Sequence, residues 1–240
     1  MNGNANRTAI VTGAGKRVGA VLARALIDDG WRVFAHVHHA DDAVPEGAER
    51  VVADLARADC ADAIFAALGD AVPDLLVNNA ARFAEDGFGR FSSDEFDGHM
   101  AVNARAPALL IERFAAVAPR GSLVVNLLDA KLAAPNPDFL SYTLSKQALA
   151  GLTELAARAL AERGIRVNAI APSVMLPSGE QENFDAVHAL NPLGIGTDAE
   201  DVVRALRYLI ASPAVTGEVM TIDGGQRFMQ LARDVQFKNA

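Results

Sequence analysis

The sequence predicts an α/β fold in which a doubly wound, seven-stranded parallel sheet is covered by helices on both faces. Apolar runs rich in Val, Ile and Leu alternate with longer segments of helical period along the 240 residues. These runs are too continuous for half-exposed strands, which is typical of a parallel sheet buried on both faces. Because 51% of the residues are hydrophobic, one sizeable core can form, and we expect a single domain over residues 1–240.

Seven apolar runs are predicted to be the strands of this sheet. They are Thr8–Thr12, Trp31–Val37, Arg50–Ala53, Leu75–Asn78, Ser122–Leu128, Ile165–Ala171 and Val219–Ile222. Right-handed crossovers between consecutive parallel strands place helices on both faces of the sheet.

Five segments of helical period separate the strands. They are Arg17–Asp28, Cys60–Leu68, Asp94–Val117, Ser141–Arg163 and Ala199–Ala211. Ser93 and Asp198, the latter with Asp201 three residues on, mark helix starts, while Gly30 and Gly164 stand where helices end. The least regular stretch runs from Pro172 to Thr197, and we expect residues 173–197 to form a flexible substrate lid.

The composition argues for small-molecule chemistry. A net charge of -8 and a pI near 5.1 give no electrostatic footprint for nucleic acid or an anionic membrane surface. The first seven residues lack the apolar core of a signal peptide, and no apolar run approaches the length of a membrane span. Cys60, the only cysteine, has no disulfide partner within the chain and is expected to be buried. We therefore expect a cytoplasmic protein that binds neither nucleic acid nor membranes.

A glycine-containing turn, Thr12-Gly13-Ala14-Gly15-Lys16-Arg17-Val18-Gly19, follows the first predicted strand and opens a helix. Glycines there permit a tight turn and let a pyrophosphate approach the helix N-terminus, where free N–H groups and the helix dipole favour negative charge. An ordinary glycine-containing loop is the alternative. The position of the turn after strand one of an alternating pattern favours Rossmann-like dinucleotide binding.

The end of the second predicted strand distinguishes NADP from NAD. An acid there would bind the ribose hydroxyl of NAD and repel the 2′-phosphate of NADP, whereas this chain has His38 and His39. Lys16 and Arg17 add positive charge, and a histidine paired with phosphate tends to stay protonated. We predict NADPH/NADP, with Asp41–Asp42 as the feature that favours NAD. No Cys or Glu completes a ligand set with these histidines, so we predict no metal.

Tyr142 and Lys146 form the candidate proton-transfer pair. Residues four apart share one helix face, and this helix follows the fifth strand, close to the switch point of the sheet. Lowering a phenol pKa by two or three units takes about 3–4 kcal/mol, which a Lys cation at about 4 Å supplies at an effective dielectric of roughly 20. We therefore predict that Lys146 lowers the pKa of Tyr142. A solvated helix face is the alternative.

Several short motifs occur together in a fixed order. They are Thr12-Gly13 through Gly19, Asp54-Leu55, Asn78-Asn79-Ala80, Asn103, Tyr142 with Lys146, Arg166-Val167-Asn168 with Pro172, and Asp223-Gly224-Gly225. With them the chain resembles the classical short-chain dehydrogenase/reductase family over essentially its whole length. The resemblance implies a nicotinamide cofactor, homodimers or homotetramers, and an Asn103 that orders the active-site helix and a water relay beneath Lys146.

The resemblance also implies which residues contact the cofactor. Asn79 lies near the ribose, the turn after Pro172 lies on the nicotinamide side, and Asp54 accepts a hydrogen bond from the adenine amino group. The predicted cofactor-binding residues are Gly13, Lys16, Arg17, Val18, His38, His39, Asp54, Leu55, Asn79, Ala80, Tyr142, Lys146, Pro172 and Ser173.

Two departures from the family pattern bear on the substrate. Arg17 stands where the family has a third glycine, and Asp129, thirteen residues before Tyr142, stands where it has a catalytic Ser. An ionised Asp cannot donate to a ketone oxygen and would repel the negative charge that grows there. It can accept N–H donors or stabilise an iminium, which favours reduction of a C=N bond. The alternative role for Asp129 is to cap the turn that follows the strand.

Arg17, Asp129 and Phe83 resemble the pteridine reductase and dihydromonapterin reductase branch, where a Phe sandwiches the pterin against nicotinamide. The branch's Ser at the position of Ala81, and its phosphate-binding Arg and Ser at the positions of His39 and Ala40, are absent. On its own, Phe83 would more often be a core residue. The predicted substrate-binding residues are Arg17, Phe83, Asp129, Tyr142, Met175 and Leu176.

The leading hypothesis is therefore NADPH-dependent reduction of a dihydropterin or related pteridine, catalysed by Asp129, Tyr142, Lys146 and Asn103. One alternative keeps the fold and changes the substrate to a carbonyl, 3-oxoacyl or imine compound. Another is a catalytically silent dinucleotide-binding sensor, against which the presence of both Tyr142 and Lys146 argues.

Overall fold

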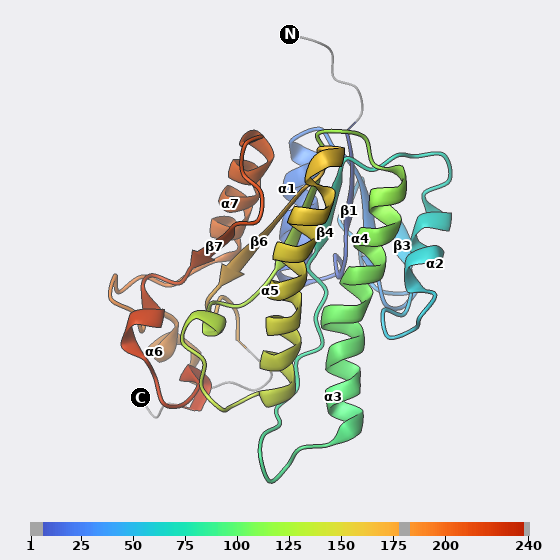
Figure 1. The fold of residues 1–240 in the computed structure, drawn as a ribbon. Helices are drawn as coiled ribbons and strands as arrows, with labels where there is room; N and C mark the ends of the chain where they lie inside the picture. The colour runs from blue at the N-terminus through green and yellow to red at the C-terminus, as the bar shows by residue number, and fades with distance from the viewer. Residues whose placement is uncertain (1–6, 178–182, 238–240) are drawn as a thin grey trace.

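A seven-stranded parallel sheet forms the centre of the protein in the computed structural model, which describes residues 7–177 and 183–237 (Figure 1). Its order is β3-β2-β1-β4-β5-β6-β7, so the chain winds outward from β1 in one direction and then from β4 in the other. The predicted fold class is thus confirmed. The strands are β1 (Thr8–Val11), β2 (Arg32–Val37), β3 (Glu49–Val52), β4 (Leu75–Asn78), β5 (Leu123–Leu127), β6 (Arg166–Pro172) and β7 (Val219–Ile222).

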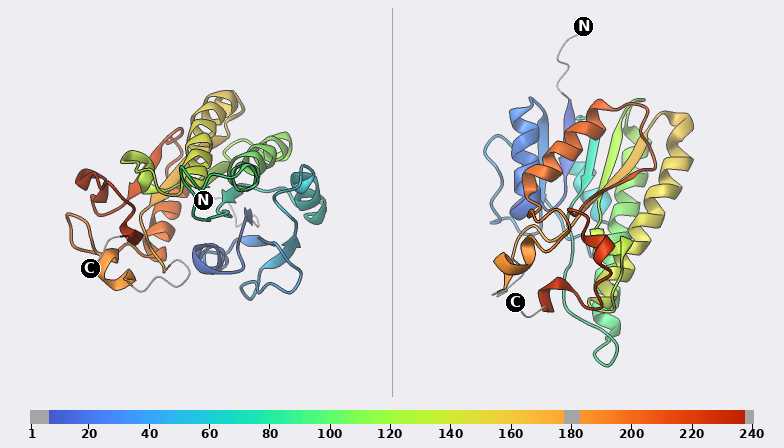
Figure 2. Two further views of the ribbon diagram at one scale, coloured as in Figure 1. Left: turned by 90° about the horizontal axis from the view of Figure 1, so that it is seen from below. Right: turned by 90° about the vertical axis from the view of Figure 1, so that its left-hand side faces the viewer.

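Helices cover both faces of the sheet (Figure 2). Successive side chains of β1 point to opposite faces, so Ile10 packs in one apolar cluster with Phe114 while Val11 packs in the other with Leu22. The first face carries α2 (Cys60–Ala67), α4 (Ala106–Val117) and α5 (Leu140–Leu160), and the second carries α1 (Arg17–Asp28) and α7 (Ala199–Ala211). Cys60 is buried, as expected.

The helix predicted over Asp94–Val117 is interrupted. It consists of α3 (Ser93–Met100), a π-helical turn η1 (Ala101–Arg105) and α4. Pro107 has no N–H to donate to the carbonyl four residues earlier, that of Asn103, so regular α-helical bonding cannot pass this point. The residue that caps α3 is Ser92, whose side chain accepts a hydrogen bond from Glu95 N, and not Ser93.

Other helix boundaries are close to those predicted. Asp198 and Asp201 form the capping box that begins α7. The helix predicted over Ser141–Arg163 comprises α5 and a 3-10 turn, η3 (Ala161–Arg163), and the chain then passes through Gly164 at φ 69°.

The segments that follow β5, β6 and β7 are short and irregular. They contain η2 (Ala130–Ala133), α6 (Phe184–His188), η4 (Gln226–Met229) and η5 (Val235–Phe237). Residues 178–182 of the predicted lid, and the first six residues of the chain, lie outside the described residues. Within the described part of the chain, no helix is both long enough and apolar enough to span a bilayer.

Candidate active site

A cavity of about 1070 Å³ lies at the carboxyl ends of the strands, the edge where ligands bind in doubly wound sheets. All the predicted cofactor-binding and substrate-binding residues line it, whereas Asn103 lies behind the lining. The lining residues come from the carboxyl ends of strands, from the loops that follow β1 to β6, from α1, η1 and α5, and from the C-terminal segment. The topology of the sheet thus brings predicted site residues that are far apart in the sequence together around this cavity.

The glycine turn after β1 is tightly packed. Gly13 has φ +64°, and a Cβ there would lie 2.9 Å from Ala80 Cα. A Cβ at Gly19 would collide with the carbonyl oxygen of Gly13. Arg17, which replaces the family's third glycine, adopts φ 53°, a left-handed conformation that costs a non-glycine residue free energy. The turn therefore keeps its glycine-like backbone at Arg17 although the residue has changed.

The first turn of α1 fits an anionic ligand. Its N-cap residue, Lys16, has extended backbone angles and no side-chain cap, and the first turn of this helix carries no acidic residue. The N–H groups and positive dipole end of such a turn favour negative charge. Lys16, Arg17 and Val18 all line the cavity, so these residues suit the phosphates of a dinucleotide.

The end of β4 is tied to the same turn. Asn79 Nδ2 donates to the carbonyl oxygens of Thr12 (2.8 Å) and Gly13 (3.2 Å), and Ala80 N donates to Thr12 Oγ1 (3.0 Å). Asn79 and Ala80 thereby fix the wall opposite α1 while they line the cavity.

His36, inside β2, has a structural role. Its Nδ1 accepts a hydrogen bond from Gly13 N (3.2 Å), so its Nε2 carries the proton and donates to the carbonyl of Ala53 (3.0 Å). Burial lowers the pKa of His36. The imidazole is therefore neutral and holds the glycine turn against the sheet.

The two histidines after β2 lie at the cavity wall. His38 Nδ1 is 3.9 Å from Asp54 Oδ1, and its ring meets that of His39 edge-on, with centroids 4.1 Å apart. Asp42 accepts a hydrogen bond from His39 N (2.8 Å), which is the main cause that lowers the pKa of Asp42. Because Lys16 and Asp42 both line this end, positive and negative charge meet where a 2′-phosphate would bind.

Asp129, Tyr142 and Lys146 lie together at the ends of β5 and α5. Tyr142 OH donates to Asp129 Oδ2 (2.9 Å), and Lys131 N donates to Asp129 Oδ1 (2.8 Å). Asp129 therefore caps η2, which was the alternative role, and also accepts a hydrogen bond from Tyr142. Its role toward a substrate stays a prediction. Lys146 Nζ donates to the carbonyl of Leu127 (2.6 Å) and lies 5.7 Å from the centre of the Tyr142 ring.

The prediction that Lys146 lowers the pKa of Tyr142 is wrong for this arrangement. Burial, the negative charge of Asp129 and the hydrogen bond to Asp129 raise the pKa of Tyr142 well above its usual value. Burial also raises the pKa of Asp129 and lowers that of Lys146 to about 8. Burial, the largest cause, and the carboxylate in direct contact with the phenol together set the direction of the shift in the pKa of Tyr142.

Phe83 is a partly exposed platform. The residue is 45% exposed, which excludes a core residue. Its ring stacks on Phe139 with centroids 4.6 Å apart, and it meets the Tyr142 ring edge-on at 4.8 Å. Phe139 in turn stacks on Phe237 at 5.6 Å. The Phe83 ring also lines the cavity, so a flat ligand in this space would meet an aromatic surface there.

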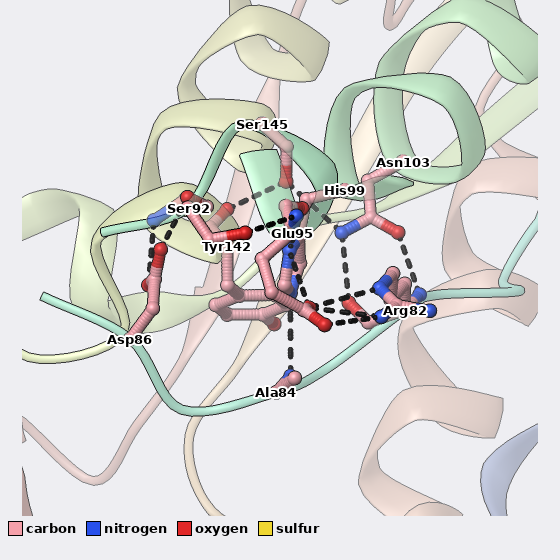
Figure 3. A network of polar contacts seen from close by, with 10 residues as sticks. Arg82, Ala84, Asp86, Ser92, Glu95, His99, Asn103, Tyr142 and Ser145 are labelled. Carbon is pink, nitrogen blue, oxygen red and sulfur yellow. Dashed lines mark hydrogen bonds and ion pairs between the residues drawn. The ribbon is translucent and has the colours of Figure 1, made fainter. Parts of the chain in front are cut away.

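Asn103 connects the Phe83 loop to the active-site helix (Figure 3). Its Oδ1 accepts from Arg82 N (2.7 Å), and its Nδ2 donates to Arg82 O (2.9 Å) and to Ser145 Oγ (2.9 Å). Ser145 precedes Lys146 on α5. This contact agrees with the ordering role that the family resemblance implies for Asn103.

Arg17 reaches across the cavity to the segment after β6. Its guanidinium donates to the carbonyl oxygens of Pro177 (2.8 Å) and Leu176 (3.4 Å). Ser173 Oγ lies 2.9 Å from Thr197 Oγ1. Arg17 thus joins the glycine turn to the beginning of the predicted lid, a contact that the sequence did not indicate.

The C-terminal segment supplies a wall of the cavity that sequence reasoning missed. Lys131, only 8% exposed at its side chain, pairs with Asp234 Oδ2 (3.2 Å) and donates to Asp138 O (2.5 Å). The lining residues from this segment are Gln226, Arg227, Leu231, Asp234, Val235 and Gln236. The sequence signal was a few scattered apolar residues, Phe228, Met229, Leu231, Val235 and Phe237, which do not predict where the segment docks.

Comparison with known proteins identifies relatives along almost the whole chain. A family model described as enoyl-(acyl carrier protein) reductase matches residues 13–227. The solved structure of FolM alternative dihydrofolate reductase 1 from Brucella canis, complexed with NADP, is 33% identical, with a TM-score of 0.83 over 93% of this chain and 95% of that one.

Two curated proteins match at similar identity. Pteridine reductase 1 of Leishmania tarentolae is 31% identical over 279 residues, covering 90% of this chain and 95% of that protein. The 3beta-hydroxysteroid dehydrogenase 1 of Eggerthella lenta is 31% identical over 247 residues, covering 91% and 93%. The relatives therefore carry names for more than one substrate class at the same level of similarity.

Proposed function

The chain belongs to the short-chain dehydrogenase/reductase family, and from that premise we propose that it is an NADPH-dependent reductase of a dihydropterin or related pteridine. The observation that carries the proposal is the hydrogen bond between Tyr142 and Asp129 at the cavity wall (2.9 Å). A ketone reductase needs a donor at that position for its growing oxyanion, whereas a carboxylate is suited to N–H groups. The relatives complexed with NADP or named for pteridine reduction support the same assignment.

Phe83 supports a flat heterocyclic substrate. Its ring stacks on Phe139, lies perpendicular to the Tyr142 ring and lines the cavity, so a ligand stacked against it would lie beside the Tyr142–Asp129 pair. Offset stacking of this kind contributes about 0.5–1.5 kcal/mol beyond the area that it buries. The ring nitrogens of a pterin would then be within reach of both polar side chains.

In this proposal the bound nicotinamide supplies a hydride to a ring carbon of the substrate. Tyr142 holds a proton that it gives to the adjoining ring nitrogen, and Asp129 orients the phenol and accepts N–H donors of the ring. A raised pKa of Tyr142 is compatible with this role, because a ring nitrogen that has gained an electron pair is a far stronger base than a phenolate. The Lys146 ammonium, 5.7 Å from the ring centre, stabilises the phenolate that remains.

The direct test is NADPH oxidation with 7,8-dihydropterins, including the biopterin and monapterin forms, alongside a panel of ketones and 3-oxoacyl thioesters. We expect turnover with at least one dihydropterin at a kcat/KM well above that for any carbonyl compound. Turnover of carbonyl compounds with none of the dihydropterins would overturn the proposal and leave a carbonyl reductase of the same family.

Lys16 is expected to favour NADPH over NADH. Replacing it with Gln should raise the KM for NADPH up to about fivefold and leave the KM for NADH nearly unchanged, because an exposed charge pair contributes at most about 1 kcal/mol. Arg24→Gln, an exposed residue on α1 that does not line the cavity, is the matched control. Equal losses with both cofactors would contradict a role for Lys16 at the 2′-phosphate.

The pH dependence should follow Lys146. Its pKa is lowered to about 8 by burial, so the ammonium dominates below that pH and is lost as the pH rises through it. We expect kcat to fall above about pH 8, because the phenolate of Tyr142 then loses its nearby cation. Lys146→Arg, which stays charged, should move or remove this decline in a kcat-versus-pH profile measured at saturating NADPH; an identical decline in the variant would assign it to another group.

A homodimer or homotetramer and a cytoplasmic location, both expected from the sequence, stay predictions. Size-exclusion chromatography with light scattering on the purified protein tests the first, and fractionation of the producing cells tests the second.

A further inference from the structure

The backbone on both sides of Phe83 is anchored by side chains of the interrupted helix α3–η1 (Figure 3). Arg82, before it, is held through both its N–H and its carbonyl by Asn103. Ala84, after it, donates its N–H to His99 Nε2 (3.2 Å). Phe83 thus lies between two anchored peptide groups, although its own ring is partly exposed.

The hydrogen bonds of His99 determine its protonation. Because Nε2 accepts from the Ala84 N–H, it carries no proton, and Nδ1 must donate to the carbonyl of Glu95 (2.7 Å). The side chain is completely buried. Both ring nitrogens are therefore used, and the imidazole is held as one neutral tautomer.

The charged side chains near His99 form an ion pair with each other. The Glu95 carboxylate, whose Oε2 lies 3.9 Å from His99 Nδ1, forms a two-pronged ion pair with the Arg82 guanidinium (2.8 Å). The edge of the His99 ring faces Tyr142, with centroids 6.4 Å apart. One buried side chain therefore contacts both the backbone that carries Phe83 and the ring of the proposed proton donor.

We propose that His99 is a positioning residue that sets substrate affinity by fixing the place of Phe83 through the Ala84 N–H. The inference rests on the proposed function in one respect, since it takes Phe83 to be the stacking platform for the substrate. His99 touches neither cofactor nor reacting atoms, because it does not line the cavity. Its hydrogen bond is to the loop, at Ala84 N, whereas its contact with Tyr142 is only between rings with centroids 6.4 Å apart. An effect through the loop changes the substrate KM, and an effect through Tyr142 changes kcat.

The sharpest variants are His99→Gln and His99→Asn. Both keep a buried polar amide, but only the Gln side chain is long enough to place an acceptor where Nε2 now meets the Ala84 N–H. We expect His99→Asn to raise the KM for the substrate about tenfold, the order expected when a buried donor loses its partner, with less than a threefold change in kcat. His99→Gln should retain most of the wild-type affinity, and the KM for NADPH should not change in either variant.

A double-mutant cycle with Phe83→Ala separates positioning from general destabilisation. If His99 acts through Phe83, adding His99→Asn to Phe83→Ala should raise the substrate KM no further. Hydrogen exchange gives a readout that needs no substrate: the Ala84 amide should exchange faster in His99→Asn than in the wild type, while His99→Gln stays close to it.

The outcomes distinguish this inference from the proposed function. If the wild type reduces no dihydropterin, the proposed function fails. The role of His99 can still be tested by hydrogen exchange at the Ala84 amide and by the double-mutant cycle, measured with whichever substrate the enzyme accepts. Additive KM effects in the cycle, equal KM values for the Asn and Gln variants, or unchanged Ala84 exchange in His99→Asn would each overturn the inference.

Discussion

Tyr142→Phe is expected to lower kcat by about 10²- to 10⁴-fold, the range that a positioned proton donor contributes. The substitution removes one oxygen, which now donates to Asp129 Oδ2 (2.9 Å), and keeps the buried ring that packs against Phe83. NADPH binding should change far less than kcat, because the glycine turn and α1 do not depend on the phenol and Tyr142 is one of many predicted cofactor contacts. Single-turnover measurement of NADPH oxidation at saturating substrate reports the effect.

The chain offers a matched control for this variant. Tyr208, the only other tyrosine, lies on α7 and is 52% exposed. Tyr208→Phe removes the same atom far from the cavity and should leave kcat within twofold of the wild type, in keeping with the small effects usual at the surface. Wild-type kcat in Tyr142→Phe would mean that another group delivers the proton.

The fold could be predicted from the sequence because parallel strands that are buried on both faces appear as continuous runs of apolar residues. Ile10 and Val11 are both apolar although they pack on opposite faces of the sheet, so the whole run reads as hydrophobic. The π-helical turn was missed because hydrophobic periodicity does not change there. Pro107 was the available signal, since it denies the Asn103 carbonyl its helical partner.

The candidate site was predictable where it depends on strand ends and not where it depends on how loops dock. Asp129 and Tyr142 follow from their spacing and position, and they meet in the structure. The sign of the pKa shift at Tyr142 could not be predicted from that spacing, because it depends on the burial of the phenol and on which charge contacts it. The pairing of Lys131 with Asp234, 103 residues apart, has no local pattern at all.

Asp129→Ser is expected to lower kcat/KM for a dihydropterin about a hundredfold and to raise ketone reduction. The Ser hydroxyl can donate to a carbonyl oxygen as negative charge develops there, an interaction worth about 2.7–4 kcal/mol in enzymes built for it. The carboxylate that accepts N–H donors of a pterin is lost in the same step. Removal of its charge and of its hydrogen bond also takes away two causes that raise the pKa of Tyr142.

The comparison that isolates this charge is Asp129→Asn, assayed beside Asp129→Ser with a dihydropterin and a ketone. Asn keeps an oxygen that can accept from Lys131 N, and Ser is an equally good N-cap residue, so both variants preserve the cap of η2. If the carboxylate selects nitrogen-rich substrates, both variants lose dihydropterin turnover and only Ser gains ketone turnover. If Asp129 serves only as a cap, both the Asn and the Ser variant behave like the wild type with both substrates. The measured quantity is the kcat/KM for dihydropterin divided by that for ketone. This ratio falls in the Ser variant if the carboxylate selects the substrate, and it does not change if Asp129 is only a cap.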